Sequence, residues 1–192
     1  MVRFEDGSTM RLYRQTVEDF GLYTGKELSE ADMESLVEAA GKMSAKMRAV
    51  RIVSATSVSK RDLQQRLIQK GEDPEQAREA VQWMSDLSLL DDAKVAEQVV
   101  ARCIAKGYGL ARAKQALFEK KVPKEFWEDA LADYPDQEDK IEDFLRAKIS
   151  DSRDSREVKR AVDALMRRGH SYGAVRRVLN QLQLDNQDFL ED

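Results

Sequence analysis

The sequence of 192 residues is poor in the residues that build several classes of site. It contains one cysteine, Cys103, and one histidine, His170. One cysteine cannot form an internal disulfide, and one histidine cannot supply the clustered ligands of a zinc site or join a catalytic dyad with that cysteine. We therefore expect no metal site and a cytoplasmic protein, and we single out no cofactor-binding or catalytic residue.

Long apolar runs and turn-forming residues are also scarce. The longest stretch without a charge is about eight residues, 52–59, far below the ~20 apolar residues that span a bilayer. Residues 1–14 lack the apolar segment of a secretory signal. Three prolines, nine glycines and 7% aromatic residues disfavour a sandwich or barrel, whereas 42% apolar and 35% charged residues are typical of amphipathic helices. The composition predicts a soluble, mainly α protein.

The net charge of −4 conceals alternating strips of opposite charge. Basic residues outnumber acidic ones by eight to two in residues 41–72, by seven to one in 100–124 and by eight to three in 153–179. Residues 125–143, in contrast, hold nine acidic residues and one basic residue. The acidic balance argues against a protein that binds phosphates over its whole surface, but it is compatible with a recurring basic face.

The first 28 residues differ in pattern from the rest. Apolar and polar residues alternate there around an Asp-Gly pair at 6–7, which predicts a short β-hairpin. Residues 29–32 then resemble a capping box, with aspartate in place of the usual glutamate. They open a helix that runs to about Thr56 and that Gly41 could interrupt.

Further helices are predicted by caps, apolar spacing and helix-ending residues. They run over about 60–70, 74–84, 92–106, 110–121, 126–131, 141–149, 157–168 and 172–182.

These helices repeat with steps of 50 and 48 residues. Equivalent positions carry small or apolar residues on the helix faces and a helix-ending residue after each second helix. The aligned sets are Leu63, Ala113 and Ala161; Leu67, Leu117 and Leu165; Gly71, Lys121 and Gly169; Ala77, Trp127 and Val175; and Val81, Leu131 and Leu179. The register predicts three tandem three-helix units, packed on their neighbours in an elongated, curved array.

The predicted organisation has five parts. They are the hairpin and loop (1–28), the first repeat with a long leading helix (29–90), the second repeat (91–134), the third repeat (135–184) and an acidic tail (185–192).

Four short motifs follow one another at residues 59–71, 89–96, 106–122 and 167–172. They resemble, in this order, the S-x-x-E-L…L…K-G element, the L-x-D-D-x-x-F/Y-A signature, the K-G…L…K-G-I segment and the R-R-G-F-S segment of the RecX family of bacterial RecA modulators. The resemblance covers about residues 48–182, with the motifs in family order and at family spacing.

Three positions depart from the family pattern. Lys121 replaces a common glycine, and His170 replaces the phenylalanine after the R-R-G motif. The arginine usual before the first serine motif is missing around residues 56–58. These departures concern individual contact residues more than membership of the family.

The resemblance implies a regulator and not an enzyme. Proteins of this family bind RecA, chiefly its filament on single-stranded DNA, and lower its ATPase, strand-exchange and coprotease activities by occupying the filament groove or limiting extension. It therefore implies a role in DNA repair, homologous recombination and the SOS response. We expect RecA and its filament as partners, single-stranded DNA as a further partner, no membrane, and a monomer.

Candidate contacts with RecA or DNA are the basic residues of the three repeats. They are Lys60, Arg66 and Lys70 in the first; Arg112, Lys114, Lys120 and Lys121 in the second; and Lys159, Arg160, Arg167, Arg168, Arg176 and Arg177 in the third. For any single member, an ordinary solvated helix position is the more frequent role.

Other conspicuous residues have a structural interpretation beside a functional one. Asp91 and Asp92 could form a metal pair, but a helix cap beside the positive helix end is the better interpretation. The tryptophans could stack on bases, yet their helical spacing favours the core. His170 fits capping or packing, Cys103 fits a small core position, and residues 106–109 lack the context of a nucleotide loop.

Two other functions remain open. A direct DNA-binding protein of helix-turn-helix-like repeats would bind without RecA and with a steep dependence on salt. A hydrolase that used Asp91, Asp92 or the acidic residues 125–143 has little support, and turnover abolished by a chelator would be required to revive it.

Overall fold

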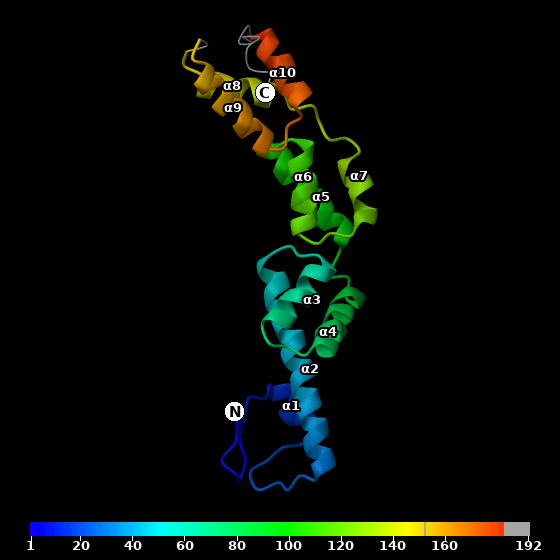
Figure 1. Ribbon diagram of the computed structural model, residues 1–192. Coiled ribbons are helices and arrows are strands. Elements are labelled where there is room, and N and C mark those ends of the chain that lie inside the picture. Colours follow the sequence, from blue (N-terminus) through cyan, green and yellow to red (C-terminus); the bar gives the residue numbers. More distant parts are fainter. Residues whose placement is uncertain (152, 183–192) are drawn as a thin grey trace. The chain divides into compact units, whose positions relative to one another are not determined.

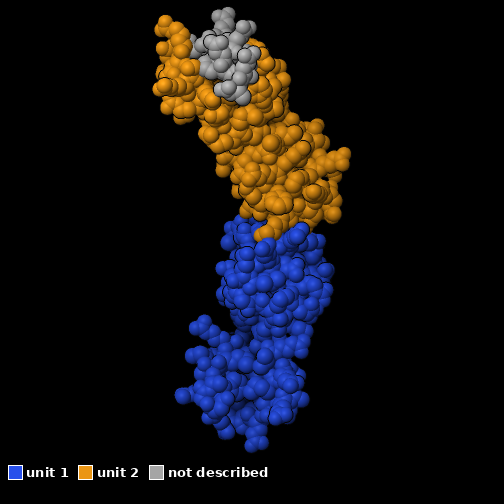
Figure 2. Space-filling view, in the orientation of Figure 1, with its two compact units in different colours: residues 1–91 blue, residues 92–192 orange. Residues whose placement is uncertain are grey.

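The computed structural model describes residues 1–151 and 153–182. The predicted acidic tail, residues 185–192, lies outside the described residues. The described chain is mostly helical, with one small hairpin at its start, which confirms the predicted fold class. It forms two compact units, residues 1–91 and 92–192, which Figure 2 colours separately. Among the described residues, no helix is both long and apolar enough to cross a membrane.

The first unit begins with the predicted hairpin. Strand β1 (Val2–Arg3) pairs antiparallel with β2 (Thr9–Met10). Gly7 in the turn between them has a φ of 83°, a conformation that glycine adopts without strain. The carboxylate of Asp6 accepts a hydrogen bond from the backbone N–H of Ser8 at 2.8 Å. An Asp-Gly turn with this local bond is what the sequence pattern predicts.

The helices of the first unit are α1 (Arg14–Asp19), α2 (Glu30–Ala55), α3 (Lys60–Gln69) and α4 (Pro74–Asp86) (Figure 1). Helices α2, α3 and α4 begin at the predicted caps. Helix α1 was not predicted, since it lies within residues 1–28, expected to be hairpin and loop, and no side chain caps its start. Ser29 and Asp32 form a reciprocal capping box at the start of α2. The hydroxyl of Ser59 caps α3, and the carboxylate of Asp73 caps α4 ahead of Pro74. Each cap satisfies backbone donors that would otherwise lack a partner in the first helical turn.

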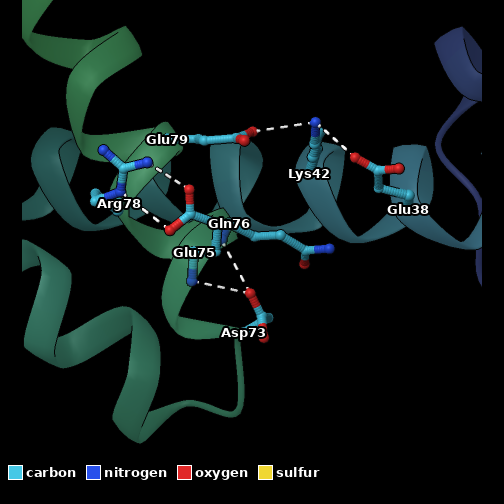
Figure 3. A network of polar contacts seen from close by, with 7 residues as sticks. All are labelled: Glu38, Lys42, Asp73, Glu75, Gln76, Arg78 and Glu79. Carbon is cyan, nitrogen blue, oxygen red and sulfur yellow. Dashed lines mark hydrogen bonds and ion pairs between the residues drawn. The ribbon is translucent and has the colours of Figure 1, made fainter.

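Helix α2 continues through Gly41 without a break, so the interruption considered there does not occur. A Cβ atom on Gly41 would lie 2.4 Å from Oε1 of Gln76 in α4, so a larger residue there would displace the flexible end of the Gln76 side chain. Figure 3 shows the adjacent ion pairs, in which Lys42 lies 2.8 Å from a Glu38 oxygen and 3.4 Å from a Glu79 oxygen. Hydrogen bonds to Glu38 and then Glu79 raise the pKa of Lys42.

The turn between α3 and α4 contains a buried charge. Glu72 is 8% exposed, and its carboxylate lies 2.6 Å from Nε of Arg48 in α2. The Ser44 hydroxyl donates to the same carboxylate at 3.1 Å, and Nη1 of Arg48 donates to the carbonyl of Lys70 at 3.2 Å. These contacts compensate for the desolvation of the carboxylate. They connect α2 to the end of α3 beside an apolar core shared by α2, α3 and α4.

The second unit contains two smaller apolar cores (Figure 1). Its elements are α5 (Asp92–Ala105), α6 (Leu110–Glu119), the 3₁₀ turn η1 (Lys124–Phe126), α7 (Trp127–Leu131), α8 (Glu138–Lys148), α9 (Ser155–Arg167) and α10 (Tyr172–Gln181). One core lies among α5, α6 and α7, and the other among α8, α9 and α10.

The repeated register is visible at the end of each second helix, α3, α6 and α9. The three aligned leucines are fully buried. Four residues later the backbone turns to positive φ, at 89° for Gly71, 53° for Lys121 and 85° for Gly169. In each case the next N–H donates back to the carbonyl of the aligned leucine, at 3.1 to 3.2 Å. The same Schellman motif therefore ends all three helices, and Lys121 adopts the glycine conformation.

Within the second unit, the start of α6 touches the α9–α10 turn through backbone atoms. Gly109 donates to the carbonyl of Arg168 at 2.9 Å, and Ala111 donates to that of Gly169 at 3.2 Å. A Cβ atom on Gly109 would lie 2.1 Å from the Gly169 oxygen, and one on Gly169 would lie 2.2 Å from the Arg112 nitrogen. Because neither position has room for a side chain, the two glycines permit this direct contact between the second and third repeats.

His170 closes the same junction. It is 6% exposed, and its Nε2 lies 3.0 Å from the carbonyl oxygen of Gly107. Burial lowers the pKa of His170, which favours a neutral ring whose Nε2–H donates to that carbonyl. Nearby, the Tyr134 hydroxyl donates to the carbonyl of Tyr108 at 2.6 Å. Burial, followed by the influence of Cys103, raises the pKa of Tyr134 to about 12.

Candidate partner-binding surface

The basic residues proposed in the first repeat lie on α3 and at its end. Lys60 is exposed at the first position of the helix, and Lys70 is exposed at its C-cap, directly after Gln69. Arg66 is half-buried, and its Nη2 lies 2.9 Å from an oxygen of Asp62, one turn earlier. The basic residue at the end of α3 also complements the negative end of the helix dipole. Two of the three predicted contacts therefore expose their side chains.

In the second repeat the predicted residues follow α6. Lys114 is exposed on the outer face of the helix. Arg112 binds Glu119 through Nη1 at 2.9 Å, which raises the pKa of Arg112. Lys120 and Lys121 end the helix, both half-buried, within the Schellman motif. Lys114 is thus the member of this set whose side chain extends furthest into solvent.

The third repeat presents an exposed basic face on α9. Lys159, Arg160 and Arg167 are all exposed. Arg156, one turn before Arg160, belongs to the same face and is absent from the predicted set; its carbonyl accepts a hydrogen bond from Arg160 Nε at 3.1 Å. Four-residue spacing from Arg160 is the sequence signal that identifies it. Asp163 is the exposed acidic residue among them.

Helix α10 contributes two arginines with different surroundings. Arg177 contacts acidic residues of the segment before and at the start of α8, at 2.6 Å from Glu138 and 3.6 Å from Asp136. Arg176 is exposed. The acidic strip at residues 125–143 therefore has, in part, an internal role, because two of its carboxylates hold α10.

Arg168 is engaged by the protein itself. Its Nη2 donates to the carbonyl of Lys106 at 2.9 Å. Its guanidinium carbon lies 5.4 Å from the ring centroid of Tyr108 and 5.0 Å from that of Phe144, within the range of cation–π attraction. The side chain therefore fastens the α9–α10 turn to the end of α5, at the junction already described.

The tryptophans are structural, and a phenylalanine is the most exposed aromatic residue among the described residues of the repeats. Trp83 is half-buried beneath the ammonium of Lys46, 5.3 Å from the ring centroid. The indole N–H of Trp127 donates to the carbonyl of Val122 at 3.0 Å. Phe118 on α6, which the sequence analysis did not single out, is 70% exposed. Its position directly after a buried core leucine is the signal that it points away from the core.

Residues considered for metal binding or catalysis have ordinary environments. In the described part of the chain, no three or more metal-binding side chains form a group. Asp92 is buried at the first position of α5. Cys103 is buried, and burial raises the pKa of its thiol, which disfavours the reactive thiolate.

The described fold defines the class of the protein: tandem three-helix repeats that end their second helices with one motif and expose basic residues on those helices. A family model described as "RecX, second three-helix domain" matches residues 91–131. The chain is thus similar to the RecX family, and the curated relatives that it matches are named regulatory proteins.

Curated relatives and solved structures agree with this assignment. The regulatory protein RecX of Vibrio parahaemolyticus is 26% identical over 136 residues, covering 69% of this chain and 88% of the relative. The one from Clostridioides difficile is 23% identical over 185 residues, covering 93% and 86%. A crystal structure of a regulatory protein RecX matches with a TM-score of 0.68 at 17% identity, covering 93% of this chain and 91% of that one. RecX from Lactobacillus salivarius matches with a TM-score of 0.62 at 21% identity, covering 77% and 99%. The structural matches show the shared fold.

Proposed function

We propose that the protein binds RecA, chiefly the filament on single-stranded DNA, and lowers its ATPase, strand-exchange and coprotease activities. It acts by occupancy, as a cytoplasmic monomer in DNA repair and the SOS response, and makes or breaks no bond. The proposal rests on the similarity of this chain to the RecX family and to regulatory proteins named RecX.

The described surface supports the proposal physically. The basic helices α3, α6 and α9 occupy the same place in their repeats, so similar charged faces recur along the chain. Long lysine and arginine side chains can lay their aliphatic stems on a helix while the charged group reaches a phosphate or carboxylate. A nucleoprotein filament offers both kinds of anion, which suits a set of basic residues attached to a repeating frame.

The test is the ATPase activity of RecA on single-stranded DNA during titration with this protein. The informative variant replaces Lys159, Arg160 and Arg167 with alanine. A matched variant removes three exposed basic residues, Lys124, Arg146 and Lys148, that lie outside the predicted set. We expect the wild type and the matched variant to inhibit, and the α9 variant to inhibit less at equal folded concentration. An unchanged ATPase rate with wild-type protein at every ratio would remove the proposal.

The exposed basic face of α9 also favours a second candidate, direct binding to DNA without RecA. Binding to single strands would then weaken with salt by a logarithmic slope of about 0.7 per phosphate contact. Loss of three such contacts in the α9 variant would reduce the slope by about 2. Binding that persists without RecA and follows this change would favour the second candidate.

A further inference from the structure

One exposed apolar side chain recurs at the same position of every repeat. The residue directly after the buried, aligned leucine is Ile68 in α3, Phe118 in α6 and Met166 in α9. Their exposed fractions are 39%, 70% and 40%, although the leucine beside each is fully buried. Three large apolar side chains thus extend from the same place on the second helix of three successive repeats.

Folding alone does not account for this pattern. A position directly after a core residue on an amphipathic helix lies away from the apolar stripe, and a lysine or glutamate there forms helix at least as well as isoleucine or phenylalanine. Single exposed hydrophobic residues are common on protein surfaces. The recurrence at one structural position in three repeats of different sequence is what requires an explanation.

A basic residue follows the apolar residue at the C-cap of each helix, two residues later: Lys70, Lys120 and Arg168. Lys70 is exposed and Lys120 is half-buried, whereas Arg168 is held by the carbonyl of Lys106. On α6 the surface is best developed, because Lys114 lies one turn before Phe118 and is exposed. Leu110, one further turn back, is 41% exposed. The outer face of α6 is therefore an apolar strip bordered by positive charge.

The identity of the three side chains distinguishes between two kinds of ligand. A base of single-stranded nucleic acid stacks on an aromatic face, and isoleucine and methionine have none. All three side chains can fill an apolar pocket, which is how anchor residues at protein interfaces contribute most of their binding energy. Basic neighbours favour a pocket with an acidic rim.

We propose that Ile68, Phe118 and Met166 are equivalent anchors, each of which inserts into an apolar pocket with an acidic rim on a protein partner built from repeated subunits. A partner that presents the same pocket at intervals explains why the chain presents the same anchor in each repeat. The identification of that partner as the RecA filament rests on the proposed function. Phe118 is the principal anchor because it exposes the most apolar surface.

The test measures binding of purified variants to RecA filaments on single-stranded DNA, and separately to single-stranded DNA alone, by fluorescence anisotropy. The variants are Phe118→Ala, Phe118→Met and Phe118→Trp. Tyr23→Ala is the matched control, because Tyr23 is an aromatic residue of nearly equal exposure, 72%, outside the repeats. Circular dichroism establishes that each variant is folded, which the exposure of both positions leads us to expect.

We expect Phe118→Ala to weaken filament binding about tenfold, the size of a strong interface anchor. Phe118→Met should retain affinity within about threefold, since methionine fills the equivalent position in α9, and Tyr23→Ala should bind like the wild type. Filament binding by Phe118→Ala equal to wild type would overturn the inference. Retention by Phe118→Trp together with loss by Phe118→Met would overturn it in favour of base stacking. Failure of the wild type to bind filaments would refute the proposed function instead.

Discussion

Replacement of Gly109 by alanine tests the close contact between the second and third repeats. The backbone of Gly109, at φ −75° and ψ 166°, is one that alanine adopts without strain. The whole effect should therefore arise from the new Cβ atom, which would lie 2.1 Å from the carbonyl oxygen of Gly169. Because the obstacle is backbone, a side-chain rotation cannot relieve the clash.

The magnitude follows from the contacts that must yield. A carbon and an oxygen need roughly 3 Å or more between them, so the start of α6 and the α9–α10 turn would separate by roughly 1 Å. That movement breaks or weakens the bonds from Gly109 to Arg168 and from Ala111 to Gly169, and the one between His170 and Gly107. At about 1 kcal/mol for each hydrogen bond, we expect a loss of about 3 kcal/mol. This loss corresponds to a fall in Tm of roughly 6–12 °C for a chain of this size.

The control is Gly71→Ala, at the position of the first repeat that corresponds to Gly169 in the third. Gly71 has a φ of 89°, and a Cβ atom there would have no neighbour within 4 Å. Alanine at this position therefore adds backbone strain of about 1 kcal/mol but no clash. Calorimetry gives the two values of Tm, and amide exchange over residues 155–182 locates the loss. If Gly109→Ala melts within about 1 °C of the wild type, or no lower than Gly71→Ala, the close contact is not required and the reasoning fails.

Three further predictions concern buried polar groups. Arg48→Ala leaves the buried carboxylate of Glu72 without its cation and should lower the free energy of unfolding, measured with urea, by about 3 kcal/mol. The control Arg78→Ala removes an exposed ion pair and should lower it by less than about 1 kcal/mol. Equal losses would contradict the role of burial. Because the pKa of His170 is lowered in the folded protein, the unfolded chain binds more protons near its ordinary pKa of about 6.5. The stabilisation by neutral His170 is then complete above that pH and is lost as the pH falls below it, so Tm should decrease from pH 7 to pH 5, and His170→Gln should reduce this dependence. Spectrophotometric titration should show one tyrosine ionising near pH 12, and Tyr134→Phe should abolish that step.

Helix boundaries were predictable because the interactions that set them are local. The caps at Ser29, Ser59 and Asp73 each satisfy N–H groups two or three residues away, so a window of four residues contains the cause. Gly41 shows the limit of that approach. Glycine disfavours helix locally, but α2 continues through Gly41 and packs against α4 and α3 around one apolar core.

The basic residues of the candidate surface could be located from the sequence, but which of them bind other parts of the protein could not. Sequence located the basic residues, yet Arg177 is paired with Glu138, 39 residues away, and Arg168 binds a carbonyl 62 residues away. Contacts at such separations depend on the packing of α8 with α10 and of α5 with the α9–α10 turn. Phe118 is a different case, because its position directly after Leu117 is a local signal of exposure that the sequence already contains.

The sequence by itself determined the helices, their caps and ends and the three-fold register, because each of these depends on neighbouring residues or on a spacing that repeats. Tertiary structure decided which charged groups are held internally and which extend into solvent, and it required glycine at 109 and 169, where backbone atoms leave no room for a Cβ atom. The physical reason is that desolvation and steric exclusion depend on atoms brought together from distant parts of the chain.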